Sequence, residues 1–132
     1  MLDFAADFAE SIELPAVLEL VGDVGAGKTT FTRGLARGLN IKEQITSPSF
    51  TLSKRYNFSR HGESATLVHY DFYRLSDPGI MQQDLTESIA DKKAIVVVEW
   101  ADSVKELLPK KHLKLTFALN DDGSRTVEWN QS

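Results

Sequence analysis

The sequence predicts an α/β fold with three layers, in which a mixed central sheet (a parallel core plus antiparallel hairpins) is flanked by helices. Segments with helical spacing of apolar residues alternate with compact apolar runs, which is typical of a parallel sheet. The run Ala94 to Val98 contains four β-branched residues in succession, as a strand covered on both faces does. Polar turns at 59–63 and 120–123 each separate two strand-like runs and predict hairpins.

The first third of the chain contains three predicted elements. Apolar residues at helical spacing across 2–11 predict a short amphipathic helix that ends before Pro15. The compact run from Ala16 to Val21 predicts a buried strand, because it is apolar throughout most of its length and ends at a glycine. Helical spacing returns over 29–39 and predicts a second amphipathic helix.

The rest of the chain predicts the hairpins, the central strand and two further helices. We expect the central strand at 94–98, the strands of the first hairpin at 50–58 and 66–70, and those of the second at 113–119 and 125–129. The pair Asp77-Pro78 opens an expected helix that reaches about Ile89, and a short helix is expected near 102–108.

Length and composition limit the classes of protein that the chain can belong to. Its 132 residues are expected to form a single domain, residues 1–132. The absence of cysteine excludes disulfide frameworks, zinc fingers and thiol nucleophiles, and it favours a cytoplasmic location. No apolar run is long enough to cross a membrane. The net charge of −4 argues against broad, non-specific binding of nucleic acid.

A glycine-rich stretch carries the main functional signal. Residues 22–29 match the motif G-x-x-x-x-G-K-[ST] completely, between a predicted buried strand and a predicted helix. Phosphate oxygens must be met by several backbone N–H groups at once, and Gly22, Gly25 and Gly27 allow the required curvature. The following helix directs its N-terminal dipole at the same phosphates, and the Lys28 ammonium bridges the β and γ oxygens. The stretch therefore predicts a P-loop, and with it an NTPase-type fold.

A bound triphosphate requires Mg²⁺, and two acids are candidates to hold it beside the Thr29 hydroxyl. Glu99 directly follows the central strand, at the Walker-B position, and Asp71 ends the strand predicted at 66–70. Hydroxyls in the segment 46–51 are candidates to complete the metal shell or to orient water. Such a Ser/Thr/Pro cluster is also typical of an ordinary loop.

Several readings of this site stay open. GTP is disfavoured because neither an Asn-Lys-x-Asp element nor an Asp-x-x-Gly switch occurs. A small P-loop kinase that transfers phosphate from ATP to a metabolite is the main alternative, although only Arg74 lies between Asp71 and Ala94 to serve an arginine-rich lid. A nucleotide-gated binding module without useful turnover is a third reading.

Four motifs, in matching order and spacing, together resemble the TsaE (YjeE) family of bacterial ATPases. The residues that carry the resemblance are Gly22 to Phe31, Thr46 to Leu52, His69 to Leu75, and Glu99-Trp100. The resemblance runs from about Phe4 to Trp129. It implies a P-loop α/β fold with extra antiparallel strands and an accessory ATPase of tRNA threonylcarbamoyladenosine synthesis. The partners it implies are TsaD and TsaB, with tRNA engaged only indirectly, and its cofactors are ATP and Mg²⁺.

The resemblance also implies residue roles. Lys28 and Thr29 would bind phosphate and Mg²⁺, Glu99 would be the second metal ligand, and Asp71 the acid near the γ-phosphate. Thr51 and Ser49 would belong to a switch-like loop, with Ser49 standing where the family usually has Thr. The expected ATP contacts are Asp23, Val24, Gly25, Ala26, Gly27, Lys28, Thr29 and Thr30, with Arg125 as a base or ribose contact or, equally, an exposed side chain.

Other polar and aromatic residues are expected to have structural or solvent-facing roles. The three histidines, His61, His69 and His112, lack metal-ligand spacing and are interpreted as structural or exposed. Trp100 and Trp129 are interpreted as packing residues. Solvated faces are expected for the basic residues Arg33, Arg37, Lys54, Arg55 and Arg60 and for acids such as Asp84.

Overall fold

The computed structural model describes residues 2–22, 27–45, 53–72, 79 and 81–131. Its elements follow the predicted order: α1 (Leu2–Ser11), β1 (Ala16–Val21), α2 (Lys28–Gly38), β2 (Ser53–Arg60), β3 (Glu63–Asp71), α3 (Met81–Ala90), β4 (Ala94–Glu99), the 3₁₀ helix η1 (Ala101–Leu107), β5 (Leu113–Leu119) and β6 (Arg125–Gln131). The predicted starts of the first hairpin at Phe50 and of the third helix at Asp77-Pro78 lie outside the described residues.

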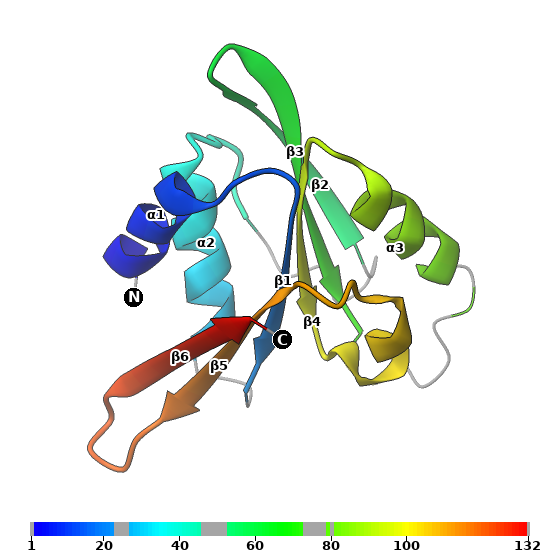
Figure 1. The fold of residues 1–132 in the computed structure, drawn as a ribbon. Helices are drawn as coiled ribbons and strands as arrows, with labels where there is room; N and C mark the ends of the chain where they lie inside the picture. Colours follow the sequence, from blue (N-terminus) through cyan, green and yellow to red (C-terminus); the bar gives the residue numbers. More distant parts are fainter. Residues whose placement is uncertain (1, 23–26, 46–52, 73–78, 80, 132) are drawn as a thin grey trace.

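The sheet is mixed, as the sequence predicts. Its six strands lie in the order β2-β3-β4-β1-β5-β6, and the inner four run parallel (Figure 1). β2 and β6 pair antiparallel at the two edges through hairpins with β3 and β5. All six residues of β4 are buried, which confirms the β-branched run as a central strand. The fold is therefore the expected α/β type.

Helices cover both faces of the sheet and create two apolar cores. On one face, α1 and α2 pack over a core that includes Leu18, Phe31 and Val97. On the other, α3 and η1 pack over a core that includes Val96 and Val98 (Figure 1). Successive residues of β4 therefore face opposite cores, because side chains alternate along a strand.

The two helices of the first face approach each other at Gly38, the last residue of α2. A Cβ atom added there would lie 2.5 Å from the carbonyl oxygen of Ala6 and 2.8 Å from the Cβ atom of Ala9, both in α1. Close backbone approach therefore requires glycine at this position. This packing role depends on a contact with α1 that the spacing of residues within the helix does not reveal.

Replacing Gly38 by alanine is expected to lower the free energy of unfolding by about 2 kcal/mol, because overpacking against α1 exceeds alanine's gain in helix propensity. Chemical denaturation of the two proteins measures the effect. Arg37→Ala is the matched control, since Arg37 is exposed one residue earlier and its loss is expected to change stability by about 0.5 kcal/mol or less. A Gly38→Ala protein as stable as the Arg37 control would contradict the close contact.

Arg60 closes the end of the first core that is remote from the glycine loop. Its guanidinium donates hydrogen bonds to the carbonyl oxygens of Ile12, of Ala9 (2.7 Å) and of Glu10 (3.2 Å). These carbonyls lie at the end of α1 and just after it, where helix carbonyls lack intrahelical donors. The interpretation of Arg60 as a solvated residue is therefore wrong, because its partners lie about 50 residues away in sequence.

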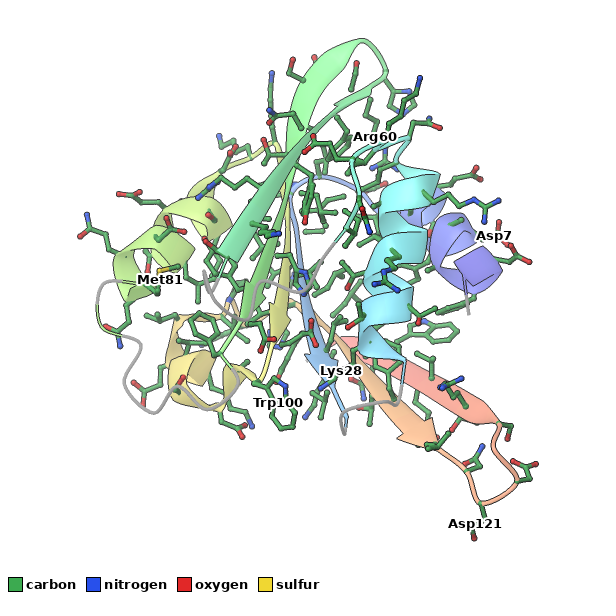
Figure 2. The ribbon with its side chains drawn as sticks, turned by 180° about the vertical axis from the view of Figure 1, so that it is seen from behind. Asp7, Lys28, Arg60, Met81, Trp100 and Asp121 are labelled. Carbon is green, nitrogen blue, oxygen red and sulfur yellow. The ribbon has the colours of Figure 1, made fainter. Side chains whose placement is uncertain are left out.

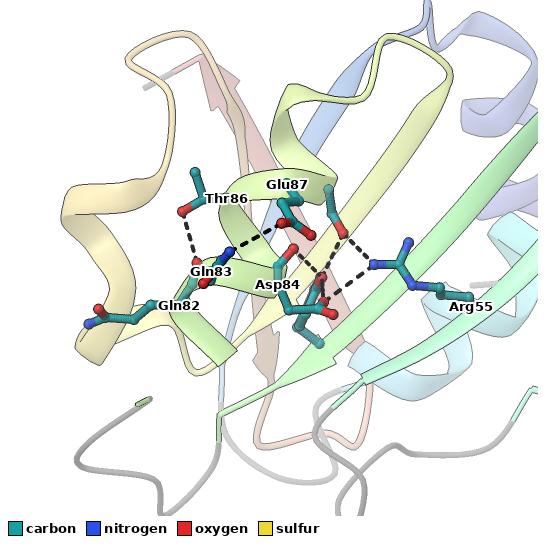
Figure 3. Close-up of polar contacts among 8 residues, drawn as sticks. Arg55, Gln82, Gln83, Asp84, Thr86 and Glu87 are labelled. Carbon is teal, nitrogen blue, oxygen red and sulfur yellow. Dashed lines mark hydrogen bonds and ion pairs between the residues drawn. The ribbon is translucent and has the colours of Figure 1, made fainter. Parts of the chain in front are cut away.

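A polar cluster joins α3 to the sheet. The buried Tyr70 hydroxyl of β3 donates to an Asp84 carboxylate oxygen and lies 2.7 Å from the Ser88 hydroxyl. Arg55 of β2 donates to the same Asp84 oxygen (3.3 Å) and to Ser88 (2.9 Å), and Figure 3 shows Arg55 directed at the helix. Asp84 and Arg55 thus pair α3 with β2, and both side chains stay open to solvent, as the sequence predicts.

Replacing Tyr70 by phenylalanine is expected to lower the free energy of unfolding at neutral pH. The variant should then lose less stability than wild type as the pH rises above 10. Burial, followed by the hydrogen bond to Asp84, raises the pKa of Tyr70 well above its ordinary value of 10.0. Stability from this group is therefore complete below pH 10 and falls as the pH rises further, because the unfolded chain loses the proton first. Denaturation from pH 8 to 11 tests this: the gap between wild type and Tyr70→Phe should shrink above pH 10, and a constant gap would contradict it.

Candidate functional site

Gly22 and both candidate acids lie at the carboxyl end of the parallel strands. Gly22 follows β1, while Asp71 and Glu99 are the last residues of β3 and β4. These three strands are parallel, and the register places Asp71 opposite Glu99 and Glu99 opposite Leu20. The carboxyl ends of parallel strands are the usual location of ligand sites in α/β sheets.

Gly22 has a structural requirement that the motif alone does not reveal. Its φ is +147°, and an added Cβ atom would lie 2.5 Å from the carbonyl oxygen of Phe117 in β5. Both the backbone angle and the neighbouring strand therefore favour glycine. The loop leaves β1 through a position at which no side chain fits.

The second conserved position of the motif, Gly27, precedes the first turn of α2. Its φ is +109°, in the region that favours glycine, and no side chain caps the helix. The first amides of an α-helix have no intrahelical acceptor, and the helix dipole makes this end positive. Thr29 and Thr30 lie half-buried in this turn. The start of α2 can therefore receive an anionic group.

Lys28 is buried at the centre of the site. Its ammonium donates to the carbonyl oxygen of Gly22 at 2.5 Å and lies 4.0 Å from Glu99 Oε1. It also lies 4.1 Å from the centre of the Trp100 ring, and Figure 2 shows the two residues at the same end of the molecule. A lysine that is 5 % exposed requires such partners, since an unpaired buried charge is costly.

Trp100 contributes to the site as well as to packing. It directly follows Glu99 and adopts a left-handed backbone conformation, with φ at 56°. Its half-buried ring packs against the core beneath α3 and η1 while meeting the Lys28 ammonium. The sequence predicts only the packing role, because the ring contact depends on this unusual backbone turn.

His69 is a second residue that sequence analysis assigned only a structural role. It is completely buried in β3, and its Nε2 atom lies 2.5 Å from Glu99 Oε2. The available signal was its spacing: His69 and Asp71 are two residues apart, so they share one face of the strand. His112 does have a structural partner, with its Nε2 atom 3.0 Å from Glu19 Oε1 in β1.

The structure brings only part of the predicted site together. Gly27, Lys28, Thr29 and Thr30 line the start of α2, with Asp71 and Glu99 at the neighbouring strand ends. Arg125 is exposed at the start of β6, paired with Leu119 beside the hairpin turn. The predicted loop contacts Asp23, Val24, Gly25 and Ala26 and the switch residues Ser49 and Thr51 lie outside the described residues.

The oxygen groups at the carboxyl end of the strands fit a Mg²⁺ ion that takes most of its ligands from phosphates and water. They do not fit a metal ion whose ligands all come from the protein. Within the described ranges, no group of three or more His, Cys, Asp or Glu side chains is arranged to hold a metal. Mg²⁺ needs only one or two protein oxygens when phosphates and water supply the rest. The carboxylates of Glu99 and Asp71 are 5 % and 8 % exposed, and the Thr29 hydroxyl belongs to the adjacent helical turn.

A glycine loop between a parallel strand and a helix, with a buried lysine facing a strand-end carboxylate, defines a P-loop protein. The family model described as "Threonylcarbamoyl adenosine biosynthesis protein TsaE" matches residues 1–127. The chain belongs to the TsaE family.

Similar proteins agree with this assignment. The TsaE protein of Bacillus subtilis (strain 168) is 38% identical over 112 residues, which cover 84% of this chain and 66% of the relative. That of Haemophilus influenzae is 32% identical and covers 97% of this chain and 81% of the relative. The crystal structure of Bacillus YdiB superposes with a TM-score of 0.71 at 34% identity, covering 96% of this chain and 74% of the other. The chain thus spans about two thirds of the B. subtilis relative's length.

Within the part of the chain that the structure describes, every helix is too short or too polar to pass through a lipid bilayer.

Proposed function

We propose that this protein binds ATP with Mg²⁺ and hydrolyses it as an accessory ATPase of tRNA threonylcarbamoyladenosine modification. We further propose that it acts in the cytoplasm on a complex of TsaD and TsaB homologues, which carries the carbamoyl transfer and engages the tRNA. Relatives named as tRNA threonylcarbamoyladenosine biosynthesis protein TsaE support this assignment.

The observation that carries the proposal is the buried Lys28 ammonium at the start of α2. Its hydrogen-bond acceptor, the Gly22 carbonyl, is neutral, and the Glu99 carboxylate oxygen Oε1 lies 4.0 Å away. A triphosphate would offer anionic oxygens at the same helix terminus, and charge-assisted hydrogen bonds are stronger than neutral ones. Lys28 would therefore leave the Gly22 carbonyl for the β and γ oxygens.

The two acids have different proposed roles. Glu99 lies nearer Lys28 than Asp71 does, so Glu99 is proposed as the metal ligand together with the Thr29 hydroxyl. When bound, Mg²⁺ neutralises charge on the phosphate oxygens. Asp71, one strand further from β1, is proposed to orient the attacking water and accept its proton. Thr51 is proposed to complete this group and Arg125 to contact the base or ribose.

The useful output of hydrolysis is proposed to be conformational: ATP turnover resets the partner complex between rounds of modification. This predicts slow hydrolysis by the chain alone, because the partners are proposed to complete the catalytic arrangement. No feature of the described residues favours the alternative of a small P-loop kinase.

Reconstitution of the modification reaction tests the proposal. Purified TsaD and TsaB homologues, tRNA, the threonylcarbamoyl donor and ATP are assayed with and without this chain, and the modified adenosine and released phosphate are counted per complex. We expect the chain to convert a single turnover into many and to raise phosphate release. Product that stays at one turnover would refute the proposal, and γ-labelled ATP whose label reaches a metabolite rather than water would select the kinase.

A further inference from the structure

We propose that His69 is a positioning residue for Glu99: its Nε2–H group holds one carboxylate oxygen and thereby directs the other towards the loop lysine and the phosphate side. The inference rests on the proposed function, since it assigns His69 a role in the same nucleotide site. His69 is not expected to touch the nucleotide itself.

The position of His69 is fixed by the sheet rather than by a loop. It lies inside β3, completely buried, with Val97 of β4 opposite it in the register. It faces the same side of the sheet as Asp71, because the two residues are separated by one position. Earlier inward positions of this face are apolar, with Ala65 and Leu67 in the core beneath α2. The His69 imidazole is therefore the first polar side chain after Leu67 on this face of β3, followed by Asp71 at the end of the strand.

The hydrogen-bond pattern assigns the proton to Nε2. The carboxylate of Glu99 can only accept when ionised, so the 2.5 Å contact makes His69 the donor. The other ring nitrogen, Nδ1, is buried without a hydrogen-bond partner in the described part of the chain. The hydrogen bond that the His69 side chain makes within that part is the one to Glu99.

The two oxygens of Glu99 are thereby distinguished. Oε2 accepts from His69, whereas Oε1 lies 4.0 Å from the Lys28 ammonium. The terminal torsion of a glutamate is broad when nothing restrains it. The bond from His69 removes this freedom and leaves Oε1 facing the site. Groups that orient a ligating carboxylate in this way typically change metal affinity by about 10- to 100-fold when lost.

Three substitutions at position 69 separate positioning from packing. His69→Leu removes the hydrogen-bond donor and fills the space with an apolar side chain of similar size. His69→Gln places an amide N–H group near the position of Nε2, whereas the shorter His69→Asn does not reach it. Binding of a fluorescent ATP analogue is measured during a Mg²⁺ titration and again with EDTA, which removes the metal.

We expect His69→Leu and His69→Asn to raise the Mg²⁺ concentration for half-maximal effect about 10-fold. His69→Gln should return to within about 3-fold of wild type, and nucleotide affinity in EDTA should change less than about 2-fold in all three. Equal losses with and without Mg²⁺, or a Gln variant as impaired as Asn, would overturn the proposal. If the Leu variant does not fold, the Gln and Asn pair still decides.

A second arm tests whether His69 acts through Glu99. In a Glu99→Gln background, His69→Leu is expected to cause no further change in Mg²⁺ dependence, because coupled residues are not additive. The same loss in both backgrounds would make His69 a purely structural residue. Wild-type protein that binds no ATP with Mg²⁺ would refute the proposed function, whereas normal binding with unchanged Mg²⁺ dependence in every His69 variant would overturn this inference alone.

Discussion

Replacing Lys28 by alanine is expected to weaken ATP binding about 100-fold. The ammonium is the only cation among the described residues placed between the start of α2 and the strand-end carboxylates. Its loss removes charge-assisted hydrogen bonds of about 1.5 to 3 kcal/mol each. Isothermal titration calorimetry with ATP and Mg²⁺ measures the change. Turnover of the reconstituted complex should fall to the level without the chain.

The matched control for this experiment is Lys93→Ala. Lys93 is also a lysine next to a strand of the sheet, but it is exposed and precedes β4, at the opposite edge. Its loss should leave affinity within about 2-fold, because exposed charges far from a site contribute little. If both lysine variants bound ATP as wild type does, the phosphate site would have to lie elsewhere.

Gly22→Ala is expected to damage stability and nucleotide binding together. The new Cβ atom would meet the Phe117 carbonyl oxygen at 2.5 Å, and the backbone would keep a positive φ. Strain and overpacking together are expected to lower the free energy of unfolding by about 2 to 4 kcal/mol. A shift of Gly22 would also displace the carbonyl oxygen to which Lys28 donates, which is why nucleotide binding should suffer. Denaturation and calorimetry should both register the change.

Gly123→Ala is the control that separates the two effects expected at Gly22, the clash with Phe117 and the strain of a positive φ. Gly123 has a φ of +86°, yet an added Cβ atom there would have nothing within 4 Å. Its variant should lose only about 1 kcal/mol from the left-handed conformation and bind ATP normally. Similar losses in the two glycine variants would show that Phe117 does not restrict the loop.

Elements with strong local signals were predictable from the sequence. The apolar runs that became β1 and β4 could be recognised because β-branched and apolar residues follow one another without polar interruption. The first helix, predicted to end before Pro15 and observed at Leu2–Ser11, was also recognisable, since apolar spacing is a property of a single segment. The motif located Lys28 beside a strand and a helix for the same reason.

Features that depend on contacts between distant segments were not predictable. His69 meets Glu99 across 30 residues, and Gly22 meets Phe117 of β5, so neither relation appears in local spacing. Arg60 resembles any exposed arginine in sequence, because the carbonyls that it reaches are fixed only when α1 packs against the sheet. Position in the register decides these roles, and one sequence does not reveal the register.

The alternation along β4 has an evolutionary consequence. Val98 belongs to one apolar layer, and Glu99, the next residue, faces the opposite side beside Lys28. Lengthening or shortening this strand by a single amino acid would exchange the two environments, burying a carboxylate under α3 and bringing an aliphatic group to the glycine loop. Insertions and deletions in β4 should therefore be rejected by selection far more often than conservative exchanges of one aliphatic side chain for another.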